Sequence, residues 1–235
     1  LIRINKYDEA RGKYEKSLEY GFEGYYFLGN MYKFLNKHKL IKDLHNLEEA
    51  NLPDNAVMFK ESKDVEAFIP KVLLLAIVVT IIFVTISKVI SDIQGVPYIG
   101  ADYFTLDIVA LWIIQTILHE YIHAVCYGKN ADVKIYISLS NGVLACHSTK
   151  PLEKKRFILM SIAPTLIFAV IPYIFWAVFF VNMGYIGTKV LSYCAFPFIF
   201  GVGDYINIVN TIRQVPKGGF VVNSGYHSYW FHQKE

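Results

Sequence analysis

Four long apolar runs follow one another along the second and third quarters of the chain and beyond. They cover about residues 72–90, 105–127, 157–181 and 186–212. A helix needs about 20 mostly apolar residues to cross a bilayer core of about 30 Å. The pattern therefore predicts a mostly α, polytopic membrane protein with about four transmembrane helices.

The third and fourth runs contain residues that break helices. Pro164 and Pro172 lie in the third run, and Pro197, Gly201 and Gly203 lie in the fourth. Proline removes a backbone donor and kinks a helix, which membrane helices tolerate when neighbours satisfy the freed carbonyls. We expect irregular backbone at membrane depth in both runs.

A different pattern separates the second and third runs. Apolar and polar residues alternate over 133–140, Asn141-Gly142 follows, and the pattern continues over 143–148. Alternation on both sides of Asn-Gly is the strongest short-range signal for a β-hairpin. We predict a hairpin over 133–148, between helices 2 and 3, and a helix start at Thr149, Pro151 and Glu153.

The two ends of the chain are more polar than its middle. Residues 1–69 are expected to form a small N-terminal cytoplasmic or interfacial domain, with a short amphipathic helix marked by Leu40, Ile41, Leu44 and Leu47. The membrane core would then cover 70–214. Residues 215–235 would be a cytoplasmic tail, with one strand over 215–222 that Pro216 weakens.

Composition and charge exclude several classes of protein. The chain is 54% hydrophobic and 18% charged, which is too apolar for an ordinary soluble domain. Its net charge of +3 is small and its basic residues are not gathered beside stacking aromatics, so no nucleic-acid partner is expected. The three cysteines show no paired spacing and are expected to be buried free thiols. The polar, charged first residues argue against a secretory signal peptide.

The basic residues predict an orientation in the membrane. Of 23 Lys and Arg residues, 12 precede the first run, six lie between the second and third, and three follow the fourth. With four spans these segments fall on one side, which should be the cytoplasm. We therefore expect a multi-pass protein of the cell membrane with both termini inside.

The second run carries the sequence His119-Glu120-Tyr121-Ile122-His123. Residues four apart lie on one face of a helix, so His119 and His123 can bind one metal ion, with Glu120 beside them as a base. Zinc suits imidazole ligands, and a catalytic zinc keeps one position for water. Ionisable groups in a membrane helix are costly and usually functional. The alternative is a pair of core histidines with an unrelated glutamate.

A zinc site needs a third protein ligand, and depth favours Asp204. His119 lies about 14 Å from the cytoplasmic end of its run and Asp204 about 12 Å from that of the fourth run, at about 1.5 Å per residue. The two helices run in the same direction, so the carboxylate can meet the histidines. Asp204 could instead be a hydrogen-bond partner of a histidine ligand.

Two further polar residues are weaker candidates. His147, at the end of the hairpin, is either the third ligand in place of Asp204, a donor to a developing oxyanion, or a surface residue. Asn207 lies one turn beyond Asp204 on the same helix face, where it could hold a substrate backbone or satisfy the helix break.

These motifs resemble those of the site-2 protease clan of intramembrane zinc metalloproteases, and more narrowly those of a bacterial family of small membrane zincins. The matching elements are the His119–His123 motif, Ala163-Pro164, Gly201-Val202-Gly203-Asp204-Tyr205 and Val215-Pro216-Lys217, within about residues 70–225. This sequence departs from the clan in the residues around Asp204. Site-2 proteases usually carry the Asp in a Leu-Asp-Gly or Asn-Pro-Asp-Gly context, whereas the context here is Gly203-Asp204-Tyr205. The resemblance implies zinc and hydrolysis of peptide bonds within or near the membrane.

The expected function is that of an integral-membrane zinc metalloprotease. Zinc held by His119, His123 and Asp204 would activate a water, Glu120 would act as general base, and the substrate would be a membrane-tethered protein or peptide. The hairpin edge could hold an unwound substrate strand. The alternatives are a non-catalytic zinc-binding membrane scaffold or regulator, and a transporter or channel, against which the lack of an internal repeat argues.

Overall fold

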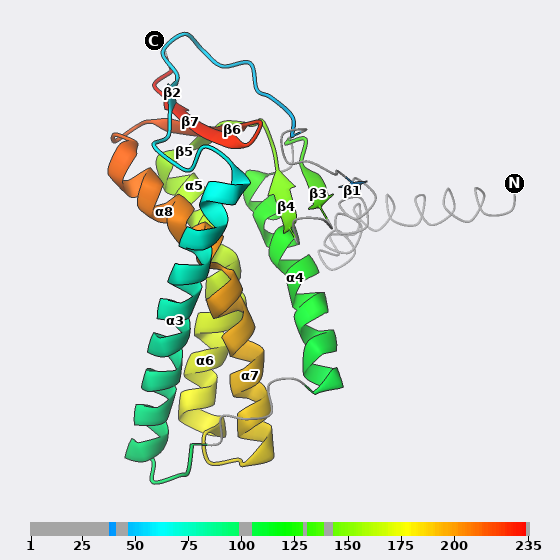
Figure 1. The fold of residues 1–235 in the computed structure, drawn as a ribbon, viewed down its shortest axis with the longest axis vertical. Coiled ribbons are helices and arrows are strands. Elements are labelled where there is room, and N and C mark those ends of the chain that lie inside the picture. Colours follow the sequence, from blue (N-terminus) through cyan, green and yellow to red (C-terminus); the bar gives the residue numbers. More distant parts are fainter. Residues whose placement is uncertain (1–37, 41–46, 99–104, 129–130, 139–142, 234–235) are drawn as a thin grey trace, which may run out of the picture.

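The computed structural model describes residues 38–40, 47–98, 105–128, 131–138 and 143–233, and shows long helices below two small β-sheets (Figure 1). The main helices of this part of the chain are α3 (Val65–Ile93), α4 (Leu106–Tyr127), α5 (Lys154–Thr165), α6 (Ile171–Phe175), α7 (Tyr185–Phe200) and α8 (Val202–Gln214). The strands are β1 (His38–Leu40), β2 (Val57–Met58), β3 (Lys134–Ser138), β4 (Val143–His147), β5 (Leu152–Glu153), β6 (Phe220–Ser224) and β7 (His227–Phe231). The fold is mostly helical, as the apolar runs predict.

Three helical segments are long and apolar enough to cross a membrane, and a fourth span results if α7 and α8 are counted together. Only 6% of the apolar window of α3 is buried within the protein, and Leu73, Leu74 and Ile81 are largely exposed. Exposed apolar surface of this extent on a helix is typical of contact with lipid. The first span starts earlier than expected, at Val65, because the carboxylate of Asp64 accepts a hydrogen bond from the amide of Ala67 and caps the helix.

The third and fourth spans are irregular, as their prolines and glycines predict. In the third, Lys154–Phe180, two π-helical turns, η2 (Leu166–Val170) and η3 (Trp176–Phe180), flank α6. In the fourth, α7 and α8 meet at a bend of 47° at Gly201. A β-carbon on Gly201 would lie 2.7 Å from the carbonyl oxygen of Pro197, so glycine allows the close approach at the bend.

The predicted hairpin is present. β3 and β4 are antiparallel, with Lys134 opposite His147 and Ser138 opposite Val143, and the turn between them lies outside the described residues. β1 pairs in parallel with β3, so the order of this sheet is β1-β3-β4 and β4 is at an edge. The free edge of β4 lies against α4 (Figure 1).

Two expectations for the chain ends differ in part from the structure. The strand expected over 215–222 begins only at Phe220, because Val215 caps α8 and residues 216–219 form a turn. The amphipathic helix expected from Leu40 does not start there, since Leu40 lies in β1; residues 41–46 lie outside the described residues.

The C-terminal tail is joined to the rest of the protein through a second β-sheet. β6 and β7 form a second hairpin, and β2 and β5 extend it to a four-stranded sheet of order β2-β7-β6-β5. The amide of Lys60 donates to the side chain of Gln214, and the carboxylate of Glu61 accepts from the amide of Ser228 at 2.9 Å. Segments from both ends of the chain are therefore joined in one sheet.

Two hydrophobic cores hold these parts together. One core joins the C-terminal half of α4 to the sheets and to α5 through Tyr121, Tyr127, Phe157 and Val221. The other lies in the helical bundle, around Phe83, Trp176 and Leu191. The three cysteines are free thiols as expected, but only Cys194 is fully buried.

Candidate active site

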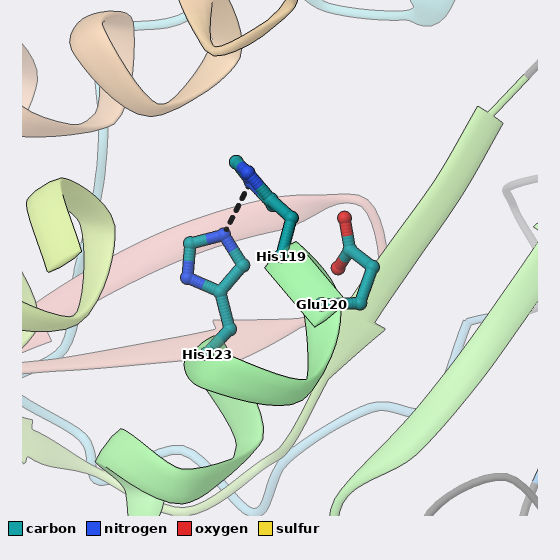
Figure 2. Close-up of side chains that lie close together, drawn as sticks. All are labelled: His119, Glu120 and His123. Carbon is teal, nitrogen blue, oxygen red and sulfur yellow. Dashed lines mark hydrogen bonds between the residues drawn. The ribbon is translucent and has the colours of Figure 1, made fainter. Parts of the chain in front are cut away.

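The two histidines of α4 point to the same place. His119 and His123 lie one turn apart, and their Nε2 atoms are 3.0 Å apart (Figure 2). The carboxylate of Glu120 lies in the same group, in which the candidate ligand atoms of the three residues are within 4.8 Å of one another. The spacing His-Glu-x-x-His brings this group together because the α-helix repeats every 3.6 residues.

A backbone carbonyl on α5 orients one of the histidines. Nδ1 of His123 lies 2.9 Å from the carbonyl oxygen of Met160. A carbonyl oxygen only accepts, so Nδ1 carries the hydrogen and Nε2 presents its lone pair to the group. This contact fixes both the tautomer and the direction of the ring.

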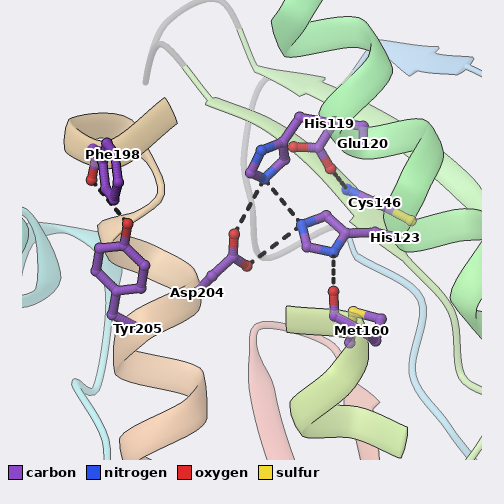
Figure 3. A network of polar contacts seen from close by, with 8 residues as sticks. All are labelled: His119, Glu120, His123, Cys146, Met160, Phe198, Asp204 and Tyr205. Atoms are coloured by element: carbon purple, nitrogen blue, oxygen red, sulfur yellow. Dashed lines mark hydrogen bonds and ion pairs between the residues drawn. The ribbon is translucent and has the colours of Figure 1, made fainter. Parts of the chain in front are cut away.

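Asp204 approaches from the opposite side, in the first turn of α8 just after the bend (Figure 3). Its Oδ2 lies 3.1 Å from Nε2 of His119, and its Oδ1 lies 3.4 Å from Nε2 of His123. Side chains of α4 and α8 therefore lie close together at the level that their positions in the sequence predict. Carboxylates are also favoured electrostatically in the first turn of a helix.

Glu120 has a different environment from Asp204. Its Oε2 accepts a hydrogen bond of 2.7 Å from the backbone amide of Cys146 on β4 (Figure 3). Glu120 is buried, and the hydrogen bond compensates part of the cost of burying its carboxylate. The contact also ties the motif helix to the edge of the hairpin.

The donor atoms fit a zinc ion. Two imidazole nitrogens and a carboxylate are a ligand set that zinc accepts, and a tetrahedral site with bonds of about 2.0–2.1 Å separates its donors by about 3.3 Å. The two Nε2 atoms are 3.0 Å apart. Oδ2 of Asp204 lies 3.1 Å from Nε2 of His119, and Oδ1 lies 3.4 Å from Nε2 of His123. That His119, His123 and Asp204 bind a metal ion is a prediction, and the agreement between observed and expected donor separations supports it.

The group is not completely buried. The side chains of His119 and Asp204 keep 17% and 14% of their surface exposed, against 7% for that of His123. Structural zinc sites are closed, whereas catalytic sites keep a position open. The exposure is thus in keeping with a site that admits a small molecule.

The structure does not bring His147 into this group. The residue is 5% exposed, and its ring packs edge-to-face against Tyr136. Burial lowers the pKa of His147. Asn207 is half-buried on α8, where its carbonyl accepts from the hydroxyl of Thr211. The roles suggested for these two residues remain untested.

Two contacts of the site come from main-chain atoms that sequence motifs do not reveal: the carbonyl of Met160 and the amide of Cys146. A signal for the first was nevertheless present. Pro164 has no N–H, so the carbonyl four residues earlier, that of Met160, lacks its α-helical partner. The register of the hairpin relative to α4 left no comparable signal for Cys146.

Residues 112–220 match the model of a family described as "putative zincin peptidase". The predicted resemblance to a family of small zincin peptidases is thereby confirmed. The match contains the histidine motif, Met160 and Asp204. Comparisons with curated proteins and with solved structures found no match. The family and the His119–Glu120–His123 group together indicate a zinc peptidase, whereas the wider link to the site-2 protease clan stays a prediction.

Proposed function

We propose that this chain is an integral-membrane zinc metalloendopeptidase that hydrolyses peptide bonds of membrane-associated substrates. The observation that carries the proposal is the meeting of Asp204, from the bent fourth span, with the two histidine nitrogens of α4 at 3.1 and 3.4 Å. Such a polar group is costly to place between apolar helices, and ionisable residues in these positions usually serve a function.

Each residue of the group has a role in this proposal. His119, His123 and Asp204 would hold the zinc ion, with the carbonyl of Met160 keeping His123 in the tautomer that presents Nε2. When bound, zinc polarises the scissile carbonyl and lowers the pKa of a water molecule. Glu120 would take the proton of that water and give it to the leaving amine. Its hydrogen bond to Cys146 holds Oε2, which leaves Oε1 for the proton transfer.

The edge of β4 is the proposed place for the substrate. In an antiparallel ladder successive residues point their backbone groups to opposite edges. Since the amide of Cys146 reaches Glu120, Cys146 and Leu144 point theirs away from β3, toward the site. Because the Cys146 amide is already bonded to Glu120, an extended substrate segment would pair with the Leu144 part of this edge and lie beside Glu120. Substrates in a helical conformation would have to unwind before they bind.

The membrane setting of the proposal depends on the spans. The histidine motif lies in Leu106–Tyr127 and Asp204 in the bent pair α7–α8, and both are long and apolar enough to cross a membrane. Glu120 contacts β4 through the amide of Cys146, so the site lies near the end of the spans that carries the β-sheets (Figure 1). Substrates tethered to the membrane would thus be held at the right depth.

The experiment that tests the function compares the parent with Glu120→Gln in proteoliposomes. The substrates are a panel of single-span reporter proteins, and zinc is measured by elemental analysis. We expect about one zinc per chain in both proteins, and hydrolysis that is lower by about 10²–10⁴-fold in the variant. Equal cleavage by both proteins contradicts the role of Glu120. Zinc binding without cleavage of any reporter by the parent favours a non-catalytic scaffold.

A further inference from the structure

Three prolines interrupt the helices that pack against α4. In an α-helix each N–H bonds to the carbonyl four residues earlier, and proline has no N–H to give. The carbonyls that lose this partner are those of Met160, Phe168 and Tyr193, which precede Pro164, Pro172 and Pro197 by four residues.

All three carbonyls accept hydrogen bonds from side chains of α4. Nδ1 of His123 bonds to Met160 at 2.9 Å. Nε2 of Gln115 lies 3.3 Å from the carbonyl oxygen of Phe168 and 3.4 Å from that of Tyr193. Each proline therefore provides an acceptor that the motif helix uses.

The two donors lie on one face of α4, together with His119, because the three are spaced by four residues. Gln115 is 2% exposed and His123 is 6% exposed. Buried amide and imidazole groups need hydrogen-bond partners, above all between apolar helices. A regular helix opposite them would offer carbonyls already engaged in its own ladder.

We propose that Pro164 is a positioning residue of the metal site, because it leaves the Met160 carbonyl available to hold Nδ1 of His123 and so directs Nε2 toward His119 and Asp204. The proposal rests on the proposed function, since it requires that these residues bind zinc. It assigns to a proline in the third span an effect on metal affinity. An N–H at position 164 would turn the Met160 carbonyl back into the helix and weaken its bond to His123.

Pro172 provides a matched control. It lies in the same span, two turns further on, and its freed carbonyl bonds to Gln115, which is not among the proposed ligands. A general effect of straightening the span would appear in both Pro164→Ala and Pro172→Ala. An effect on the ligand His123 would appear only in the first.

The test measures zinc affinity of the purified full chain by competition with a chelator. We expect Pro164→Ala to bind zinc about 10–100-fold more weakly than the parent, the usual effect of losing a partner of a ligand. The zinc affinity of Pro172→Ala should stay within about twofold of that of the parent, because the Phe168 carbonyl and its partner Gln115 do not touch a proposed ligand. The visible spectrum of the cobalt(II)-loaded protein should change in Pro164→Ala and not in Pro172→Ala.

A second pair of variants keeps Pro164 and changes the acceptor itself. Lactic acid in place of Ser161 converts the Met160 carbonyl to an ester, which is a weaker acceptor. Ser161→Ala carries the same methyl side chain on an amide and is its control. We expect zinc binding about tenfold weaker in the ester than in Ser161→Ala. This pair decides the question if Pro164→Ala does not fold.

The outcomes separate the two proposals. Parental zinc affinity and an unchanged cobalt spectrum in folded Pro164→Ala, or equal affinities in the ester and its control, overturn the role of Pro164 and leave the proposed function intact. Absence of zinc binding by the parent overturns both.

Discussion

Two carboxylates lie beside the histidines of α4, and their different contacts indicate different roles. Asp204 has both oxygens within 3.4 Å of an imidazole nitrogen, whereas Glu120 gives one oxygen to the amide of Cys146. A ligand must share its donor atoms with the metal, and a base must keep an oxygen for a proton. At the scale of residues, therefore, Asp204 is the better third ligand and Glu120 the better base.

The first prediction concerns Asp204. Asp204→Ala removes one of three proposed ligands, and two histidines alone do not make a zinc site. We expect zinc affinity to fall by more than about 100-fold, beyond the loss usual for an outer partner of a ligand. Chelator competition and elemental analysis measure it.

Asp107→Ala is the matched control. Asp107 is also a carboxylate of an apolar helix, but it lies at the other end of α4, where it pairs with Lys189 at 2.8 Å. This variant should keep its zinc. Equal zinc content in Asp204→Ala and Asp107→Ala would argue for a ligand other than Asp204.

The second prediction concerns the buried ring of His147. Burial and, to a lesser extent, the charge of Lys134 lower its pKa from 6.5, while Gly225 and Glu48 oppose that shift. The folded chain thus disfavours the protonated ring, whereas the unfolded chain protonates it below about pH 6.5. Stability is therefore fully present above that pH and is lost as the pH falls toward the lower pKa of the folded state.

We expect His147→Phe, which keeps an aromatic ring against Tyr136, to lose less stability than the parent between pH 7.5 and 5.5. Thermal unfolding of the protein in detergent at a series of pH values measures this. His232→Phe, at an exposed position, is the control and should follow the parent. An identical decline in all three proteins would show that His147 does not contribute.

At the scale of elements, the bend between α7 and α8 determines where Asp204 points. The hydroxyl of Tyr205 on α8 donates to the carbonyl of Phe198 on α7 at 3.1 Å, which bridges the bend (Figure 3). Gly201 lies at its corner, where a β-carbon would come within 2.7 Å of the Pro197 carbonyl and 3.0 Å of the Thr165 hydroxyl. The direction of α8 thus depends on the absence of a side chain.

The third prediction compares two glycines of this bend. Gly201→Ala should destabilise the protein by about 1–3 kcal/mol, because a backbone atom has to move, and should weaken zinc binding by displacing Asp204. Gly203→Ala places its methyl group in open space and should be neutral or slightly stabilising. Unfolding and zinc titration of the two variants are the measurements. A larger loss in Gly203→Ala would contradict this account of the bend.

Local sequence determined most of these elements. Runs of apolar residues predict the spans, and Asn141-Gly142 between alternating residues predicts β3 and β4. The prolines and Gly201 predict irregular backbone where the π-turns and the bend occur. In the tail, two features of the sequence are signals of the second hairpin: the apolar residues 220–222 and the dipeptide Ser224-Gly225. The expectation of one strand over 215–222 concealed them.

Pairing between distant segments was beyond what local patterns contain. β2 has two residues, and only its partner β7, some 170 residues later, makes it a strand. The contact between Asp204 and the histidines could be expected, because the position of a polar residue within an apolar run gives its depth along the helix. The contact of Glu120 with Cys146 depends on how the hairpin is placed against α4, which no single segment encodes.

At the scale of the whole molecule, the two sheets gather four helix ends on one side. β2 precedes α3, β5 precedes α5 and β6 follows α8 in a single sheet, while β4 lies against α4 near its C-terminal half. Lys154 joins these ends further, since its ammonium group donates to the carbonyls of Ile212 and Val215 at the end of α8. If the spans cross the membrane, these ends lie on the same side of it, as the distribution of basic residues predicts.

The last prediction tests this topology with single cysteines in a chain whose three natural cysteines are replaced. Lys217 lies in the exposed turn before β6, and Gln94 is exposed at the opposite end, after α3. Because basic segments stay in the cytoplasm, Lys217→Cys should react with a membrane-impermeant thiol reagent only in inside-out vesicles. Gln94→Cys should react only in right-side-out vesicles. Reaction of both from the same side would mean that α3 does not cross the bilayer, and the reverse pattern would place the zinc site near the outer face. In either case the substrates would have to be sought elsewhere, because a tethered chain reaches the β4 edge only from the side on which the sheets lie.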